Sequence, residues 1–119
     1  MEVLRSNPRE SAATAVDEFL RFDSPLHLFE RTATSDTEIG GVEIKAGQKI
    51  AALLGSANRD ESVFENPDQL DLMRDPNPHI GFGAGIHFCI GAPLARMEMT
   101  TSLPLLMERF PNLKLSEEP

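Results

Sequence analysis

One short loop constrains this chain more than any other stretch. Residues 82–91 read Phe-Gly-Ala-Gly-Ile-His-Phe-Cys-Ile-Gly and contain Cys89, the only cysteine among 119 residues. Three glycines lie within six residues of it, so the backbone there can turn tightly and approach another group closely. Pro93 follows in the first turn of a predicted helix. A thiolate at a helix start is stabilised by backbone N–H groups and the helix dipole, which favours a metal ligand or a nucleophile.

The composition narrows the class of protein. A chain of 119 residues with 40% apolar content forms one small domain at most. The net charge of −8 and the lack of a basic cluster argue against a nucleic-acid partner. No apolar run approaches about 18 residues and no signal pattern begins at Met1, so neither a membrane span nor secretion is expected. A single cysteine forms no internal disulfide, which fits a reducing cytoplasm.

The first predicted helix begins near Asn7. Asn7, Pro8 and Glu10 are typical of a helix start with a capping box, and the apolar stripe that follows predicts a helix to about residue 22. Glu18 and Arg21 lie three residues apart and therefore share a face of that helix. By themselves they indicate a surface ion pair worth a few tenths of a kcal/mol.

The rest of the chain predicts β structure, a long loop and a second helix. Residues 26–54 indicate one small antiparallel sheet, in which 50–54 form either a buried strand or a helix start. Residues 56–81 show no periodicity, and so long a loop is more often functional than filler. Residues 93–110 predict a final helix that Pro104 kinks or weakens, followed by a closing strand at 110–115.

The cysteine loop and its surroundings together resemble a known family. Four positions of the loop spell Phe-x-x-Gly-x-x-x-Cys-x-Gly, which arises by chance roughly once in a hundred thousand starts at about 5% usage per residue. A Glu-x-x-Arg helix precedes the loop, and Leu94-Ala95-Arg96 follows it. The joint pattern is similar to the C-terminal third of the cytochrome P450 family, heme-thiolate monooxygenases, of the soluble bacterial type. The implied fold is mixed α+β and mainly α, with residues 1–119 forming a partial P450 domain that carries the heme-ligand segment.

The resemblance implies a role for each matching loop residue. Cys89 is similar to the axial thiolate that binds the heme iron, and Phe82 to the aromatic residue that shields the sulfur. The other residues implied to bind heme are three glycines that allow close approach and two partners of the propionates: Gly83, Gly85, Gly91, His87 and Arg31. His79 is expected nearby.

The resemblance also changes the interpretation of the helical ion pair. Glu18 and Arg21 are similar to the buried Glu-x-x-Arg pair of the family, which an arginine from the long loop joins. Arg74 is the first candidate for that arginine and Arg59 the second. Breaking a buried pair costs about 3–5 kcal/mol, so alanine at either helix position is expected to abolish heme binding in a full-length relative.

Intact relatives insert one oxygen atom of O2 into an organic substrate and receive electrons from a ferredoxin-type donor that docks on the cysteine side. The resemblance therefore implies these two partners, with a small apolar substrate. Leu26, Leu28 and Phe29 are expected either to line the substrate pocket or to pack in the core. Arg96 is expected to face the donor, to pair with a propionate, or to pair with Glu98.

Besides a monooxygenase segment, three alternatives are considered: a non-catalytic remnant, an enzyme with a cysteine nucleophile, and a zinc site. The family's central helix, which delivers protons to bound oxygen, has no counterpart in these residues, so the chain is either a monooxygenase segment or a non-catalytic remnant that binds heme or is inert. The apolar faces of its two helices are expected to leave the isolated chain marginally folded. A cysteine nucleophile with His87 or His79 as base lacks an orienting third group. A zinc site lacks the usual ligand spacing.

Overall fold

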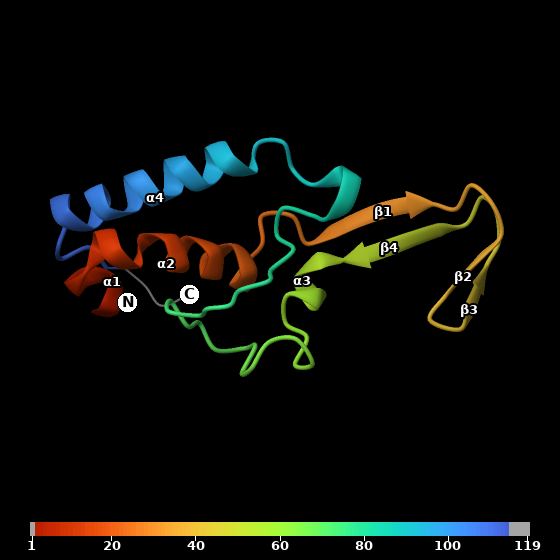
Figure 1. The fold of residues 1–119 in the computed structure, drawn as a ribbon, viewed down its shortest axis with the longest axis horizontal. Coiled ribbons are helices and arrows are strands. Elements are labelled where there is room, and N and C mark those ends of the chain that lie inside the picture. Colours follow the sequence, from red (N-terminus) through yellow and green to blue (C-terminus); the bar gives the residue numbers. More distant parts are fainter. Residues whose placement is uncertain (1, 115–119) are drawn as a thin grey trace.

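Two long helices form one half of the molecule. In the computed structural model, which describes residues 2–114, α2 (Pro8–Phe22) and α4 (Ala92–Arg109) lie side by side, and the short α1 (Glu2–Ser6) contacts both (Figure 1). Their shared core consists of four buried side chains with Phe19 and Leu103 packed against them: Leu4, Ala15, Leu72 and Met107. The first and last helical segments of the chain therefore stabilise each other.

The predicted capping box of α2 is wrong. The Asn7 side chain makes no cap hydrogen bond, because α1 runs up to this residue and the Asn7 N–H bonds to the Val3 carbonyl at 3.0 Å. The Asn7 carbonyl instead accepts hydrogen bonds from the Ser11 N–H and the Ser11 hydroxyl, at 3.1 and 2.7 Å. The predicted end of the helix at Phe22 agrees with the structure.

The β structure is divided into two antiparallel pairs rather than one sheet. β1 (Leu28–Thr32) pairs with β4 (Lys49–Leu53), and β2 (Thr37–Ile39) pairs with β3 (Val42–Ile44). The ladders separate because the chain turns at Gly47, whose φ is +86°. Asp36 also accepts the Ala46 N–H at 2.9 Å, which closes the neck of the outer hairpin.

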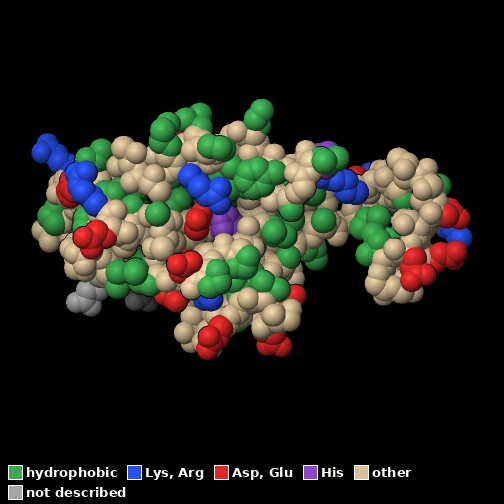
Figure 2. Space-filling view, in the orientation of Figure 1, with side chains coloured by type: hydrophobic (Ala, Val, Ile, Leu, Met, Phe, Trp, Pro, Cys, Tyr) green, Lys and Arg blue, Asp and Glu red, His purple; other side chains and the backbone are tan. Residues whose placement is uncertain are grey.

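The outer hairpin projects away from the helical half. Figure 2 shows it as a separate lobe whose far edge carries acidic and basic side chains. Lys45 Nζ lies 2.6 Å from Glu43 Oε1 and 3.1 Å from Asp36 Oδ2, and all three side chains are exposed. These contacts stabilise the tip locally and do not tie it to the core.

The apolar run at residues 50–54 divides between the two expected structures. The strand β4 ends at Leu53, and the short helix α3 (Leu54–Ala57) begins at the next residue. Residues 58–84 then form neither helix nor strand and cross the face of α2 (Figure 1). A single 3-10 turn, η1 (Gly85–His87), leads into α4.

The C-terminal part contains two differences from the sequence predictions. Pro104 lies inside α4, which continues without interruption to Arg109. Residues 110–114 contain no strand, and Leu115, the last residue of the predicted one, lies outside the described range. Between residues 2 and 114, no helix combines the length and hydropathy needed to cross a membrane.

Candidate functional site

Cys89 lies at the junction between the glycine-rich loop and α4. Its side chain is exposed and free. Its N–H donates to the Phe82 carbonyl at 2.9 Å, and its carbonyl accepts from the Ala92 N–H at 3.1 Å. Gly91 occupies the N-cap position of α4. The sulfur is thus held close to the positive end of an 18-residue helix, which favours a negatively charged ligand atom.

The glycines of this loop differ in what a side chain would meet there. Gly83 and Gly85 have φ values of +76° and +63°, in the left-handed region that side chains disfavour. At Gly91 a Cβ atom would lie 3.7 Å from Cys89 Sγ, an ordinary contact distance, so a side chain fits there but would cover one side of the sulfur. The loop therefore leaves the exposed Cys89 sulfur accessible to another group.

Strand β1 meets the cysteine loop at Phe29. A Cβ atom on Gly83 would lie 3.9 Å from Phe29 Cε2. The Arg31 guanidinium lies 5.2 Å from the Phe29 ring centroid and donates to the Glu30 carbonyl at 3.0 Å. Arg31 is exposed and forms no ion pair with any residue of the described range 2–114. His87, at the end of η1, is also exposed. Both side chains are therefore available to an anionic group.

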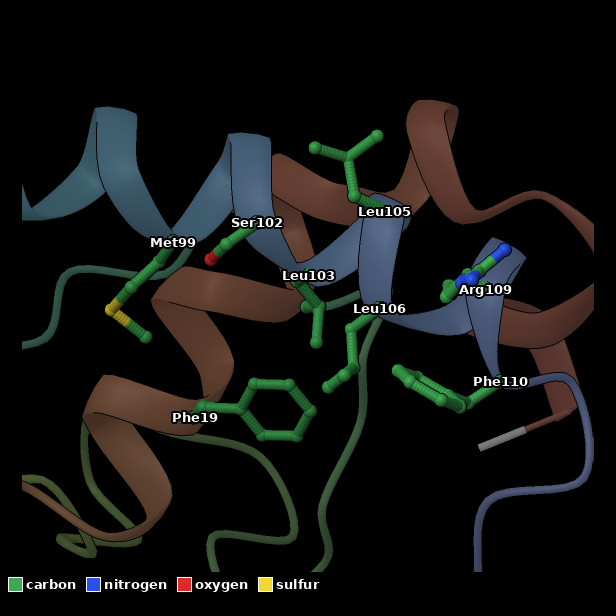
Figure 3. Close-up of a pocket in the computed structure, with 8 residues that line it drawn as sticks. All are labelled: Phe19, Met99, Ser102, Leu103, Leu105, Leu106, Arg109 and Phe110. Carbon is green, nitrogen blue, oxygen red and sulfur yellow. The ribbon is translucent and has the colours of Figure 1, made fainter.

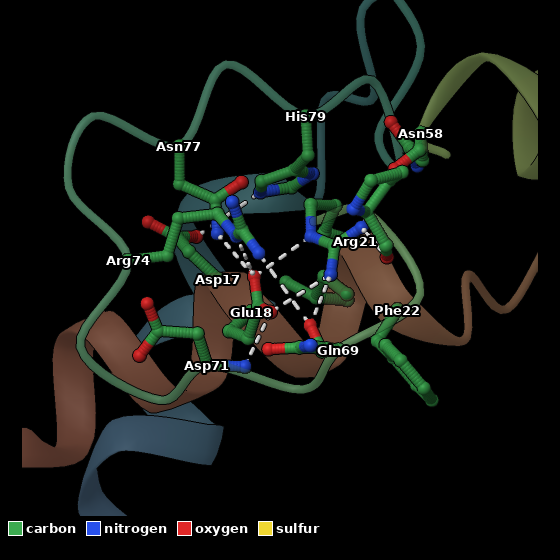
Figure 4. A network of polar contacts seen from close by, with 12 residues as sticks. Asp17, Glu18, Arg21, Phe22, Asn58, Gln69, Asp71, Arg74, Asn77 and His79 are labelled. Atoms are coloured by element: carbon green, nitrogen blue, oxygen red, sulfur yellow. Dashed lines mark hydrogen bonds and ion pairs between the residues drawn. The ribbon is translucent and has the colours of Figure 1, made fainter. Parts of the chain in front are cut away.

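A buried ion pair anchors the loop that leads to Cys89. The side chains of Glu18 and Arg21 are 0% exposed, and Arg21 Nε and Nη2 each donate to one Glu18 oxygen at 2.8 Å (Figure 4). Arg74 Nε donates to the same carboxylate at 3.1 Å, Asn77 Nδ2 at 3.0 Å and the Asp71 N–H at 2.8 Å. One carboxylate therefore binds donors from four positions along the chain besides its own.

The Arg21 side chain also binds backbone carbonyls of the loop. Its remaining N–H groups donate to three loop carbonyls, at 2.8, 2.8 and 3.2 Å: those of Asn58, Pro67 and Gln69. A planar guanidinium presents its five donors in a fixed fork, so these contacts set the position of the loop as well as its distance from α2.

Arg59, the second candidate for the third arginine, has other partners. Its Nη1 donates to Asp68 at 2.8 Å and its Nη2 to the Phe22 carbonyl at 3.0 Å. The structure thus brings Arg74, and not Arg59, to Glu18.

The pKa of Glu18 reflects two opposing effects. Burial raises the pKa, but the hydrogen bonds from Arg21 and the Asp71 N–H, with the charges of Arg21 and Arg74, outweigh burial and lower it below the ordinary value of 4.5. A carboxylate whose pKa is lower in the folded state stabilises the fold at neutral pH. That contribution is lost as the pH falls from about 4.5 through the lowered pKa.

We therefore expect an acid-sensitive contribution to stability that Glu18 carries. The urea midpoint of the wild-type chain should fall as the pH drops below about 4.5, and the midpoint of Glu18→Gln should change less over the same interval. Urea titrations followed by circular dichroism at several pH values check this. Parallel profiles for the two proteins would contradict it.

Several residues near the site were not identified from the sequence. Asn58 is completely buried, and its Oδ1 accepts the Ile80 N–H at 2.8 Å while its Nδ2 donates to Ser24 Oγ at 2.7 Å. Asn58 thereby links the end of α2 to the start of the cysteine loop. No local pattern indicates this contact, because an asparagine in a loop is ordinarily interpreted as a turn residue.

His79 and Arg96 share a partner on α2 that the sequence did not indicate. The His79 side chain is 2% exposed, with Nε2 3.2 Å from Asp17 Oδ1. Arg96 Nε lies 2.8 Å from the same oxygen, so Arg96 pairs with Asp17 rather than with Glu98. Of the expected pocket-wall residues, Leu26 and Leu28 are exposed, whereas Phe29 is half-buried.

An apolar groove lies at the other end of α4 from Cys89. Its volume is about 560 Å³, and Figure 3 shows Phe19 of α2 facing side chains of α4 across it. Its lining comes mainly from the second half of α4: Phe19, Met99, Ser102, Leu103, Leu105, Leu106, Arg109 and Phe110. The groove therefore belongs to the helical core and not to the cysteine loop.

Comparison with known proteins decides the family. The family model described as "Cytochrome P450" matches residues 12–118. The chain belongs to the cytochrome P450 family. It is 51% identical to the nocardicin C N-oxygenase of Nocardia uniformis over 98% of its own length, and 46% identical to the steroid C26-monooxygenase of Rhodococcus jostii over 93%. It spans 30% and 24% of the lengths of these two P450s.

The fold agrees with the family. The crystal structure of P450BioI, solved in complex with hexadec-9Z-enoic acid ligated acyl carrier protein, matches with a TM-score of 0.92 and 47% identity. The match covers 97% of this chain and 30% of that P450. The predicted fold class, the C-terminal part of a mixed α+β P450 fold, is thereby confirmed.

P450s bind heme through a cysteine thiolate. The described residues fit that cofactor, because the one cysteine is exposed at a helix start, beside a glycine that leaves the sulfur open. Arg31 and His87, which make no ion pair within residues 2–114, suit the negatively charged propionates.

Proposed function

We propose that residues 1–119 form the heme-ligand part of a P450 monooxygenase domain, with Cys89 as the thiolate ligand of the iron. The observation that carries the proposal is the position of Cys89. It is exposed between a glycine-rich loop and the N-terminus of α4, within a chain whose family binds heme through a cysteine. When bound, the heme supplies the activation of O2 for insertion of one oxygen atom into an organic substrate.

The other residues of the site have supporting roles in this proposal. The Phe82 carbonyl fixes the Cys89 N–H, and its ring shields one side of the sulfur from water. Gly83, Gly85 and Gly91 allow the flat cofactor to approach. Arg31 and His87 bind the propionates, since guanidinium and imidazole groups are ordinary partners of carboxylates. The pair of Glu18 and Arg21 holds the loop in place.

The partners of the complete enzyme follow from the family. We infer a ferredoxin-type electron donor on the cysteine side and a small, mainly apolar substrate. The names of its relatives include a steroid oxygenase and an acyl carrier protein complex, which supports an apolar substrate class. We assign the protein to the cytoplasm, where a lone thiol stays reduced. In this proposal, oxygen insertion is an activity of the complete P450 domain. The chain itself spans 24% of the length of the steroid C26-monooxygenase and 30% of that of the nocardicin C N-oxygenase.

A spectroscopic experiment tests the role of Cys89. The purified chain is mixed with hemin, reduced and exposed to CO, and the Soret band is recorded. We expect a strongly red-shifted band for the wild type, since thiolate ligation increases electron density on the iron, and its loss in Cys89→Ser. Ser102→Ala, in the second half of α4 and away from Cys89, serves as the control and should keep the wild-type band. A wild-type chain that takes up no heme, or a red-shifted band that persists in Cys89→Ser, would overturn the proposal.

A further inference from the structure

Three charged or polar side chains from separate segments meet behind the cysteine loop. His79 of the loop lies with its Nε2 3.2 Å from Asp17 Oδ1 of α2, and Arg96 of α4 places its Nε 2.8 Å from the same oxygen. The imidazole is almost fully buried, at 2% exposure, while Asp17 and Arg96 are about one-third exposed. Figure 4 shows His79 beside the network of Glu18. Adjacent residues of α2 therefore hold two different parts of the loop.

The hydrogen bonds define which nitrogen of the ring carries the proton. The Gly81 N–H donates to His79 Nδ1 at 3.1 Å, so Nδ1 is an acceptor. The proton of a neutral imidazole is then on Nε2, which donates to Asp17. Arg96 Nη2 lies 3.3 Å from Nε2, but both groups are donors. Asp17 is thus the acceptor that His79 and Arg96 share.

The ring is connected to Cys89 by a short path. The Gly81 N–H bonds to the imidazole, and the next residue, Phe82, accepts the Cys89 N–H at 2.9 Å. The Phe82 ring lies 6.2 Å from the His79 ring, and the Arg96 guanidinium is 4.8 Å from the Phe82 centroid. The three side chains thereby fix both the backbone and the ring of the residue on which Cys89 depends.

We propose that His79 is a positioning residue for the iron ligand, which acts through Gly81 and Phe82 on Cys89, and that it does not bind a propionate. Both of its ring nitrogens are already occupied within the protein, so no donor remains for a heme carboxylate. This inference rests on the proposed role of Cys89 as the heme ligand. It predicts that changes at His79 alter how bound heme is ligated, and not only how much heme is bound.

The test measures, in the 119-residue chain, the ratio of thiolate-ligated to other heme in the reduced CO complex. His79→Ala removes both hydrogen bonds, of which only the one from the Gly81 N–H lies on the path to Cys89. The ratio should therefore fall about fivefold, the effect expected of one ordinary hydrogen bond on an equilibrium. His79→Asn keeps an acceptor close to the place of Nδ1 and should give a ratio between those of His79→Ala and the wild type. His27→Ala is the matched control, because the His27 side chain is exposed, lies beside Asp23 and Gly55 and is remote from Gly81 and Phe82, and it should keep the wild-type ratio.

The outcomes separate this inference from the proposed function. A wild-type chain without the red-shifted band contradicts the role of Cys89 itself. If His79→Ala and His79→Asn bind less heme but show the wild-type ratio of thiolate-ligated to other heme, the positioning role alone is overturned. A merely structural histidine would lower heme content and thermal stability together without changing this ratio. Where His79→Ala does not fold, His79→Asn and Asp17→Asn, which preserve the shape of the site, decide the question by the same ratio.

Discussion

Arg21→Ala should destabilise the chain by about 3–5 kcal/mol, a large fraction of the stability of a small domain. The change leaves the Glu18 carboxylate, which is 0% exposed, without its two hydrogen bonds from the guanidinium. It also releases three loop carbonyls that Arg21 binds on the opposite side: those of Asn58, Pro67 and Gln69. The main cost is the loss of two of the five donors to a buried carboxylate, which keeps only Arg74, Asn77 and the Asp71 N–H, because water does not replace the lost donors.

Urea unfolding followed by circular dichroism measures this effect. Arg9→Ala is the matched control, since Arg9 also forms a two-bonded pair, with Glu108, but both side chains are exposed. Exposed pairs contribute little to stability, so this variant should keep a midpoint close to that of the wild type. Equal midpoints for Arg21→Ala and Arg9→Ala would show that the buried network does not hold the loop.

Gly81→Ala is the second change with a large expected effect. A Cβ atom at this position would lie 2.7 Å from the backbone oxygen of Leu20 and 3.2 Å from His79 Nδ1. The Leu20 carbonyl belongs to α2 and has little freedom to move, so the cysteine loop must shift instead. Such overpacking costs about 1–3 kcal/mol, and the shift should also reduce the fraction of heme that is bound through the thiolate.

Gly55→Ala provides a control with the same nominal clash. Its Cβ atom would also lie 2.7 Å from another atom, but that atom is Nδ1 of the exposed His27 side chain, which can rotate away. Gly55 is within α3, where alanine is the better helix former. The urea midpoint of Gly55→Ala should therefore equal or exceed that of the wild type, while the midpoint of Gly81→Ala falls. A similar loss in both variants would mean that the contact with Leu20 does not determine the position of the loop.

Predictions that depend only on adjacent residues agreed with the structure at the end of α2 and at the start of α4. The end of α2 at Phe22 and the helix after Cys89 follow from proline positions and apolar spacing. The prediction of a capping box at Asn7 was wrong because the residues before Asn7 form a helix of their own. The prediction of a single sheet was wrong because a positive φ at Gly47 and the Asp36 contact with Ala46 separate the outer hairpin from the pair of β1 and β4.

The contacts around the candidate site were less accessible from sequence. The sequence offers both Arg74 and Arg59 as partners of Glu18, with Arg74 first, and the observed path of residues 58–84 brings Arg74 to Glu18 and Arg59 to Asp68. Asn58 and Asp17 carried no signal at all, because an asparagine in a loop and an aspartate on a helix are common surface residues. Their importance comes from the side chains that the fold places beside them.

A lone thiol on a glycine-rich loop before a helix, with a Glu-x-x-Arg pair upstream, can be recognised from the amino-acid sequence without a structure. These features are local, because turn geometry, helix starts and the spacing of side chains on one helical face depend on a few adjacent residues. The contacts of Asp17 with His79 and Arg96, and those of Asn58 with Ser24 and Ile80, join segments far apart in the chain and are visible only in the folded structure. The loop between them has no repeating pattern, so its course is set by the buried donors and acceptors that it must satisfy.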